Sequence, residues 1–279
     1  PYIMGRIDSE LMYEIVMKWN WGNSERTDIY HDPETRKNSI SFRSNMARLS
    51  ELLINEDKFE KAKTIMDLAI EKMPIDYFGY YSLLVPFVDG YYRIDNVNKA
   101  KNLSKQIAYK YADRLNYFSS LNANEQYQLG EEILTEIERY RALIEADLKH
   151  NEKSDLYTTL NQFVAAITPF RYLYGDYEFY TSLIDVAEGY YLIGEVEIAQ
   201  NLSKKIADQF SERMKLFAQF PSSNQTQIQD RIKKEWSAYN YFLQIINSFD
   251  ESSFFNTLED QYNSNINLFN PESAPQEKE

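Results

Sequence analysis

Apolar residues recur along most of this chain at intervals of three and four, which is the spacing of one face of an α-helix. The first segment with this pattern places Leu11, Ile15 and Trp19 four residues apart. Asp8 or Ser9 precedes it and can accept hydrogen bonds from the free N–H groups of a first helical turn. We therefore predict a helix over residues 8 to 19, with the Leu11 stripe on its packed face.

A second helix is predicted to begin at Pro33. Asp32 stands before it as a capping residue, and proline fits a first helical turn because its missing N–H has no partner there. A polar, turn-rich link at residues 21–28 separates the two helices. The whole chain holds only 8 Gly and 8 Pro, which favours long helices with few tight turns. The predicted fold class is all-α.

From Arg43 onwards the spacing becomes that of the tetratricopeptide repeat, a helix–turn–helix unit of about 34 residues. Large and small apolar residues alternate at the required intervals, and Met and Ser replace the usual Trp and Gly. The three sets of matching positions are Met46, Leu49, Ser50, Leu53, Ala62, Met66, Ala69 and Pro74; Leu84, Phe87, Val88, Tyr91 and Ala100; and Leu183, Val186, Ala187, Tyr190 and Ala199. Polar turns are expected at residues 55–57, 95–96 and 194–195.

A longer repeat with an offset of 99 residues relates two parts of the chain. The segment from Gly90 to Leu121 recurs from Gly189 to Phe220, with 14 identities in 32 aligned positions. A later apolar stripe recurs at the same offset: Ile133, Ile137, Tyr140 and Ile144 are answered by Ile232, Trp236, Tyr239 and Leu243. A repeat at fixed offset is typical of stacked supersecondary units. We therefore predict a tetratricopeptide-like helical-repeat superhelix with two internally homologous halves.

This repeat divides the chain into four predicted parts. They are an N-terminal capping helix and linker (1–42), a first repeat half (43–150), a second repeat half (151–262) and a flexible tail (263–279). A helix ending near Pro169 is expected at the start of the second half. The tail has too little apolar content to pack.

Composition narrows the function. The 43% hydrophobic and 26% charged residues are ordinary for a soluble globular protein. A net charge of -13 leaves nothing to neutralise phosphates, so it argues against nucleic acid and against docking on anionic lipid. The absence of cysteine excludes disulfides, thiolate catalysis and cysteine-ligated metals. No run approaches the roughly 20 apolar residues of a membrane span.

Candidate chemistry is sparse. His31 and His150 do not lie in a metal-ligand spacing, and we interpret both as capping or surface residues. The acidic residues near Glu131 share a helix with the Ile133 stripe and are interpreted as its solvated face. No phosphate loop, nucleophile elbow or zinc motif occurs. We predict that this chain is not an enzyme and has no catalytic, cofactor or metal site.

Aromatic and guanidinium groups supply the candidate binding residues. The chain contains 23 Tyr and 16 Phe, and the pairs Tyr91–Tyr92 and Tyr190–Tyr191 could each turn one ring to the core and one to a groove. A second group of aromatic and Arg side chains lies before the repeats. The alternative to a binding role for these residues is that they cap the core of the first repeat. The candidate ligand or partner groove comprises Trp19, Trp21, Tyr30, Arg36, Arg43, Tyr92, Arg114 and Tyr191.

Several short motifs follow one another as they do in one bacterial family. They are Gly5-Arg6-Ile7-Asp8-x3-Met12-Tyr13, Trp21-Gly22-Asn23, Tyr30-x-Asp32, Arg43-x3-Ala47-Arg48-Leu49, Pro74, Tyr91-Tyr92 and Leu115-x2-Phe118-x2-Leu121. Their order resembles the C-terminal region of large multi-spanning Bacteroidetes membrane proteins. These form a domain family of unknown function related to protein O-mannosyltransferases. The resemblance covers nearly the whole chain and is best over residues 5–121.

This resemblance implies a tail carried outside the membrane by a glycosyltransferase that uses a lipid-linked sugar. The family's expected catalytic acids lie in the membrane part, so none is carried over to this chain. The start at Pro1, without an initiator methionine, suggests a fragment of a longer protein.

We therefore expect a non-catalytic interaction module on the periplasmic side of a bacterial inner membrane. It would bind a protein acceptor or partner, or order the oligomer. Two alternatives stay open. One is a free-standing, cytoplasmic adaptor that binds peptides; the other is a protein that binds glycans through Tyr and Trp faces.

Overall fold

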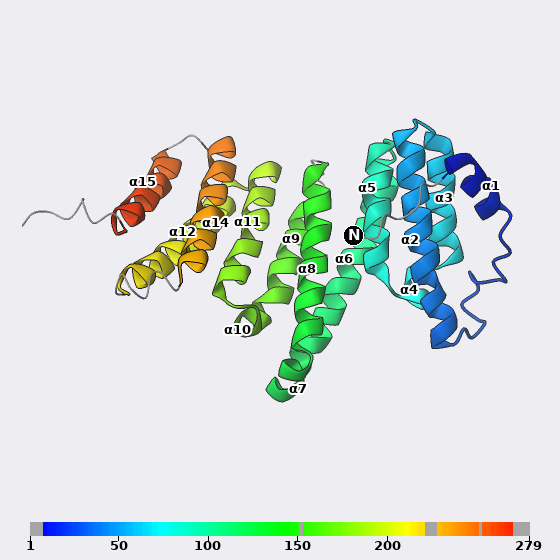
Figure 1. Ribbon diagram of the computed structural model, residues 1–279, viewed down its shortest axis with the longest axis horizontal. Coiled ribbons are helices and arrows are strands. Elements are labelled where there is room, and N and C mark those ends of the chain that lie inside the picture. The colour runs from blue at the N-terminus through cyan, green and yellow to red at the C-terminus, as the bar shows by residue number, and fades with distance from the viewer. Residues whose placement is uncertain (1–7, 151–152, 154, 221–227, 251–252, 270–279) are drawn as a thin grey trace, which may run out of the picture. The chain divides into compact units, whose positions relative to one another are not determined.

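The computed structural model describes residues 8–150, 153, 155–220, 228–250 and 253–269. Within these ranges every regular element is a helix (Figure 1), which confirms the predicted all-α class. The helices are α1 (Ser9–Met17), α2 (Pro33–Asn55), α3 (Phe59–Lys72), α4 (Ile75–Phe78), η1 (Tyr81–Leu84), α5 (Val85–Arg93), α6 (Val97–Ser120), α7 (Ala123–Gln128), α8 (Gly130–Lys149), α9 (Leu156–Ile167), η2 (Thr168–Phe170), α10 (Arg171–Tyr174), α11 (Asp176–Ile193), α12 (Val196–Ala218), α14 (Gln229–Phe249) and α15 (Ser253–Asn267). In these ranges no helix combines the length and the apolar character needed to cross a bilayer.

The chain forms two compact units. Unit 1 comprises residues 1–114 and 138–152, and unit 2 comprises residues 115–137 and 153–279. The predicted division into halves placed a boundary between 150 and 151, whereas the units divide within α6 and α8. The C-terminal part of α8 packs on unit 1, whereas its N-terminal part belongs to unit 2. The boundary between the units therefore lies within helices and not in a linker.

Buried side chains occupy the predicted repeat positions in both units. In unit 1, α2 packs against α3 and α5, and in unit 2, α11 packs against α12. The residues at these positions that are at most 4% exposed are Met46, Leu49, Ser50, Leu53, Ala62, Met66, Ala69, Leu84, Phe87, Val88, Tyr91, Ala100, Leu183, Val186, Ala187, Tyr190 and Ala199. The predicted core positions are therefore confirmed.

Three helical hairpins turn in the same way. After α2, α5 and α11, one residue with positive φ ends the helix: Asp57 (58°), Asp95 (58°) and Gly194 (87°). In each turn the N–H of this residue donates three residues back, and the next N–H donates five residues back, as Asn96 does to the Tyr91 carbonyl at 2.8 Å. This is the Schellman motif, which satisfies the last carbonyl groups of a helix. The predicted turns are confirmed.

Replacing Gly194 with alanine is expected to destabilise unit 2 by about 1 kcal/mol, because a Cβ strains the left-handed conformation. Gly130→Ala is the matched control, since Gly130 is helical and no atom lies within 4 Å of the added Cβ. That control should stabilise by about 0.5–1 kcal/mol through helix propensity and the unfolded chain. Urea titration followed by Trp236 fluorescence measures the stability change of both variants. A change in the same direction for Gly194→Ala and Gly130→Ala would contradict the prediction.

Aromatic stacking repeats at the sequence offset of 99 residues. Tyr92 stacks on His150 with ring centroids 4.6 Å apart, and Tyr191 stacks on Phe249 at 5.7 Å. The same offset relates a second pair of stacks, Tyr111 on Tyr140 at 5.3 Å and Phe210 on Tyr239 at 5.2 Å. Each stack lies within one unit. Two copies of the sequence repeat thus make the same ring contacts.

Two sequence interpretations are corrected by the structure. The expected packed stripe of α1 is wrong, because Leu11 and Ile15 are 58% and 47% exposed while Val16 is buried. This short helix has apolar residues on both of its faces, so the sequence pattern did not show which face is packed. The expected tail also begins too early: α15 continues to Asn267, and Asn265 is buried and hydrogen-bonded to Ser211. Residues 270–279, like the Gly5-Arg6-Ile7 motif, lie outside the described residues.

Candidate functional site

A cavity of about 550 Å³ lies at the N-terminal end of unit 1. Its walls come from the loop after α1, from the first turns of α2 and from the segment around α4. The lining residues are Trp19, Asn20, Trp21, Gly22, Ser24, His31, Thr35, Asn38, Ser39, Phe42, Met73 and Phe78. This volume is within the range typical of small-ligand sites. We call this cavity the aromatic pocket.

The loop after α1 is shaped by its own polar residues. The Asn20 Oδ1 atom accepts a hydrogen bond from the Gly22 N–H at 3.0 Å, forming an Asx turn. Gly22 and Asn23 then adopt positive φ, the conformation that glycine and asparagine tolerate best. Ser24 ties the loop to unit 1 by donating to the Lys72 carbonyl at 2.6 Å. This turn holds Trp21 beside the pocket.

One face of α2 forms the opposite wall. Thr35, Asn38, Ser39 and Phe42 are spaced as i, i+3, i+4 and i+7, so they lie along one side of the helix. The Phe42 ring meets Trp19 at 5.2 Å between centroids. Phe42 and Asn38 were not among the predicted groove residues. Their helical spacing with Thr35 was the sequence signal that could have identified them.

The three rings of the pocket are inclined to one another rather than parallel. Trp19 and Trp21 meet at 5.6 Å with an interplanar angle of 67°. Phe42 makes angles of 65° with Trp19 and 57° with Trp21. Inclined rings of this kind favour edge-to-face contact. Together they form a cup rather than a flat slot.

Arg43 supports the pocket from behind. Its side chain is fully buried, and its guanidinium donates to the carbonyl oxygens of Met73 at 2.7 Å, Gly79 at 2.5 Å and Tyr80 at 3.2 Å. Burial lowers the pKa of Arg43 to about 10, so the group stays charged at neutral pH. These bonds fix the segment that brings Met73 and Phe78 to the pocket. Arg43 is therefore a brace, and not a groove residue as predicted.

His31 forms one corner of the pocket. Its backbone N–H donates to the Tyr77 hydroxyl at 2.6 Å, and that hydroxyl donates to the Ile29 carbonyl at 2.6 Å. The imidazole lies 5.9 Å from the Phe78 ring. Its Nε2 atom is buried and has no hydrogen-bond partner among the described residues. The sequence interpretation of His31 as a capping or surface residue did not foresee that it lines a pocket. Its place there depends on Tyr77 and Phe78, which are far away in the sequence.

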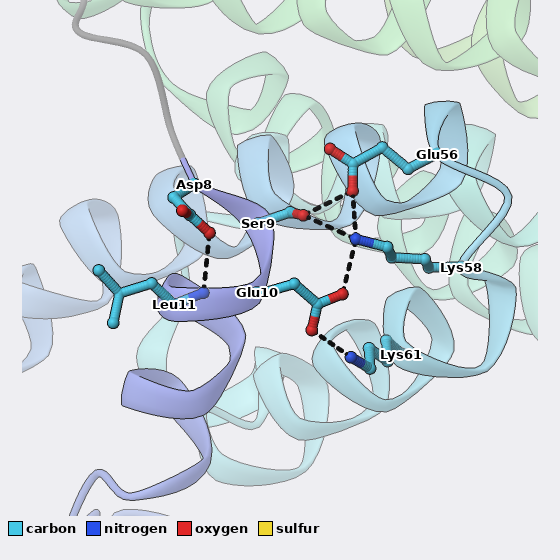
Figure 2. A network of polar contacts seen from close by, with 7 residues as sticks. All are labelled: Asp8, Ser9, Glu10, Leu11, Glu56, Lys58 and Lys61. Carbon is cyan, nitrogen blue, oxygen red and sulfur yellow. Dashed lines mark hydrogen bonds and ion pairs between the residues drawn. The ribbon is translucent and has the colours of Figure 1, made fainter.

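A polar cluster docks α1 onto the turn between α2 and α3 (Figure 2). Ser9 donates to Glu56 at 2.5 Å, and the Lys58 ammonium bonds Glu56 and Glu10, each at 2.6 Å. Lys61 bonds the second oxygen of Glu10. Asp8 caps the helix by accepting from the Leu11 N–H, as predicted. The cluster fixes the helix that leads directly into Trp19.

Acid titration is expected to release α1 before the rest of unit 1. Hydrogen bonds from Lys58 and then Lys61 lower the pKa of Glu10 from 4.5 to about 2, and a bond from Lys58 also lowers that of Glu56. A lowered folded-state pKa contributes stability that is present above pH 4.5 and lost as the pH falls towards 2. Trp19 and Trp21 fluorescence in a Trp236→Phe background measures this step.

Lys58→Met is the matched variant for that titration. It removes the shared cation, so α1 should be loosened already at neutral pH and the acid step should shrink. An acid step of the same size in Lys58→Met would contradict the assignment to this cluster.

Among the described residues, no Asp, Glu, Lys or Arg side chain lines the aromatic pocket. Twelve lining residues without Asp, Glu, Lys or Arg are unusual in a chain with 26% charged residues. Lys72 and Glu25 form an ion pair at 3.3 Å close to the loop, with Lys72 also bonded through its carbonyl to Ser24. The pocket therefore has a neutral lining in an acidic protein.

The predicted groove residues divide into groups. Trp19 and Trp21 line the aromatic pocket. Tyr30 is 80% exposed beside it, and Arg36 is half-buried with its guanidinium 5.8 Å from the Tyr77 ring.

The remaining candidates belong elsewhere. Tyr92 is half-buried between its His150 stack and a hydrogen bond to Asp147 at 3.2 Å. Tyr191 is only 7% exposed and packs on Phe249, so it has a core position rather than a groove position. Arg114 is exposed on α6.

Another polar cluster in unit 1 surrounds the Tyr92 stack. His150 Nε2 lies 2.9 Å from the Asp89 carboxylate, which also accepts from Lys149 at 2.7 Å. Burial alone would raise the pKa of Asp89, but these two bonds hold it below its usual value. The cluster ties the end of α8 to α5.

A second cavity, of about 420 Å³, is lined by α3, α5 and α6. It contains Asp67, which accepts hydrogen bonds from the Tyr91 hydroxyl at 2.6 Å and from Lys99. Asn102 also lines it. Its second acid, Glu71, pairs with Lys72 at 2.9 Å. Because both acids already have partners, this cavity offers a ligand fewer free groups than the aromatic pocket.

Among the described residues no group of three or more acids or histidines is arranged to hold a metal ion. Comparisons of the chain with protein-family models, curated proteins and solved structures gave no match. The chemistry that the aromatic pocket can perform is recognition: apolar ring faces, two amides, several hydroxyls and one imidazole.

Proposed function

We propose that this chain is a tetratricopeptide-like helical-repeat superhelix with two homologous halves. Three hairpins with the same Schellman turn support this proposal, as do the two pairs of ring stacks that recur at an offset of 99 residues. Such repeats present binding surfaces, because each unit packs on its neighbours and leaves the remaining faces free for ligands.

Its function, on this proposal, is non-catalytic binding, with the aromatic pocket as the ligand site. The observation that carries it is the pocket's construction. Three aromatic rings surround a cavity of about 550 Å³, the wall behind it is braced by the buried Arg43, and its lining offers a few polar groups for orientation.

The family resemblance supports a context for this module. It would be the soluble C-terminal part of an O-mannosyltransferase-like membrane protein, tethered on the periplasmic side, where it binds a protein acceptor or partner or orders the oligomer. A free-standing, cytoplasmic peptide adaptor is the alternative. Deleting residues 1–279 from a full-length protein and assaying glycan transfer tests the context, and unchanged transfer with unchanged complex size would contradict it.

Binding of a neutral solvatochromic dye tests the pocket itself. The wild-type chain should bind the dye with a stoichiometry of one at the pocket, and Trp21→Ala should weaken binding tenfold or more because an aromatic wall is lost. Trp236→Phe, in unit 2, is the control and should bind as the wild type does. Equal dye binding by Trp21→Ala and the wild type would contradict the proposed site.

A further inference from the structure

We propose that the aromatic pocket binds a neutral carbohydrate. This inference rests on the proposed binding function and names the ligand class for the same site. Three independent features of the pocket support it: the charge of its lining, the inclination of its rings and the unused hydrogen-bonding groups around them.

The charge of the lining argues against anionic ligands. A bound carboxylate or phosphate would need a cation or converging N–H groups. A primary ammonium would need acceptors that pair with its charge, whereas a quaternary ammonium could rest on aromatic rings alone. The lining that the described part of the chain supplies contains no Lys, Arg, Asp or Glu. The net charge of -13 further opposes anions at this surface. The lining therefore disfavours anions and offers no carboxylate to a cation, and it suits an uncharged ligand.

The ring geometry distinguishes flat ligands from puckered ones. A planar aromatic ligand can stack on both faces only between parallel rings, whereas here the rings meet at 57° to 67°. A pyranose has a puckered ring with one face of C–H groups that packs on the electron-rich face of an indole. Trp19 and Trp21 can contact such a ring from two directions. The cup of rings therefore suits a sugar better than a nucleobase.

Unused polar groups surround these rings. Asn20 accepts from Gly22 through Oδ1, which leaves its NH₂ group to donate, and the Asn38 side chain makes no hydrogen bond with the described residues. The His31 Nε2 atom is buried without a partner. Buried polar atoms are normally satisfied, so a ligand hydroxyl would remove a cost here. Sugar hydroxyls both donate and accept, which matches amides and an imidazole.

An apolar peptide side chain is the competing occupant. It would fill the ring cup but offer no hydrogen bond to the buried His31 Nε2 atom, and this favours the carbohydrate. The two occupants respond oppositely to Asn38→Leu, which keeps the side-chain size and replaces the amide by apolar atoms. Asn38 is exposed on α2, so this variant is expected to fold.

The experiment titrates the chain with neutral oligomers of glucose, mannose and N-acetylglucosamine, with a sialylated glycan and with a leucine- and proline-rich peptide. Quenching or blue shift of Trp19 and Trp21 fluorescence in the Trp236→Phe background, together with saturation transfer to sugar C–H protons, reports binding. We expect binding of at least one neutral oligosaccharide, lost tenfold or more in Trp21→Ala and in Asn38→Leu, and no comparable binding of the sialylated glycan.

The neutral dye separates failure of this inference from failure of the proposed function. Trp21-dependent dye binding without binding of any neutral oligosaccharide would overturn the carbohydrate and leave the pocket as a site. Tighter peptide binding by Asn38→Leu than by the wild type would also overturn it and assign an apolar peptide. Absence of both dye and sugar binding would overturn the two proposals together.

Discussion

Replacing Arg43 with methionine is expected to lower the free energy of unfolding of unit 1 by about 3 kcal/mol or more. The guanidinium is fully buried and donates to the carbonyl oxygens of Met73, Gly79 and Tyr80. Methionine fills a similar volume but donates nothing, so the Met73 and Gly79 carbonyls lose their donor, while the Tyr80 carbonyl keeps its bond from the Leu83 N–H at 3.1 Å. Each unsatisfied buried group costs about 1–3 kcal/mol. Arg43 is thus among the residues on which unit 1 most depends.

Urea titration measures this effect. In a Trp236→Phe background the remaining tryptophans, Trp19 and Trp21, both belong to unit 1 and lie at the pocket that Arg43 supports. Arg26→Met is the matched control, because Arg26 is 56% exposed and paired with Asp28 two residues along the chain. Such exposed pairs contribute about 0.2–1 kcal/mol. Equal losses for the two variants would contradict the brace.

Arg43→Lys refines the same prediction. An ammonium has donors enough for three carbonyls but lacks the planar fork that reaches them simultaneously. We expect it to recover less than half of the lost stability. Dye binding should weaken along with stability, since the segment carrying Met73 and Phe78 would no longer be held. Full recovery by lysine would show that charge alone, rather than geometry, matters at this position.

The second large effect is expected for Arg213→Met in unit 2. Arg213 Nε donates to the Glu235 carboxylate at 2.8 Å, and Glu235 is fully buried. The guanidinium also lies over the Phe210 ring at 4.9 Å. Removing the cation leaves a carboxylate uncompensated in the interior, and breaking buried pairs in this way costs about 3–5 kcal/mol.

The stability that Arg213→Met loses should depend on pH. Burial raises the pKa of Glu235, and Arg213 opposes that shift. A carboxyl with a raised folded-state pKa contributes stability that is present below the unfolded-state pKa and lost as the pH rises through the folded-state value. Removing Arg213 raises the pKa further. The deficit of Arg213→Met should therefore be largest near pH 7 and shrink towards pH 5.

A double substitution provides the control for the buried pair. Arg213→Met with Glu235→Leu replaces both charges by apolar groups of similar size, which is often neutral or stabilising. We expect it to recover most of the stability that the single variant loses and to remove the pH dependence. Trp236 fluorescence, from the residue beside Glu235, measures unit 2. A double variant as unstable as Arg213→Met at pH 7 would contradict the electrostatic explanation.

The repeat gives these two residues a counterpart in the other copy. Arg114 and Glu136 occupy the positions of Arg213 and Glu235 at the 99-residue offset, and Glu136 is also buried. Arg114 was predicted to line the ligand groove because an arginine recurs at the same place in both copies and its spacing did not mark it as a core residue. In the second copy Arg213 pairs with the buried Glu235, whereas Arg114 is exposed on α6.

The same comparison explains the tyrosine pairs. Tyr91 and Tyr190 are core residues, as expected, since each is at most 4% exposed. Tyr92 and Tyr191 were assigned to a groove because neighbouring residues on a helix point in different directions. Both instead stack on a ring far along the chain: Tyr92 on His150, just after α8, and Tyr191 on Phe249, at the end of α14. A recurring aromatic residue therefore marked packing between helices rather than a ligand.

By itself, the sequence determined the helical fold class, the helix–turn–helix hairpins, the core positions and the turns that end three helices. These depend on local spacing and on backbone preferences, which a sequence carries directly. It also singled out Trp19 and Trp21. Only the tertiary structure decided that Arg43 lies behind the pocket, that His31 and Phe78 line it and that α1 packs through Val16. Those positions depend on contacts between residues far apart in the chain, and periodicity within one helix cannot encode which partner covers its face.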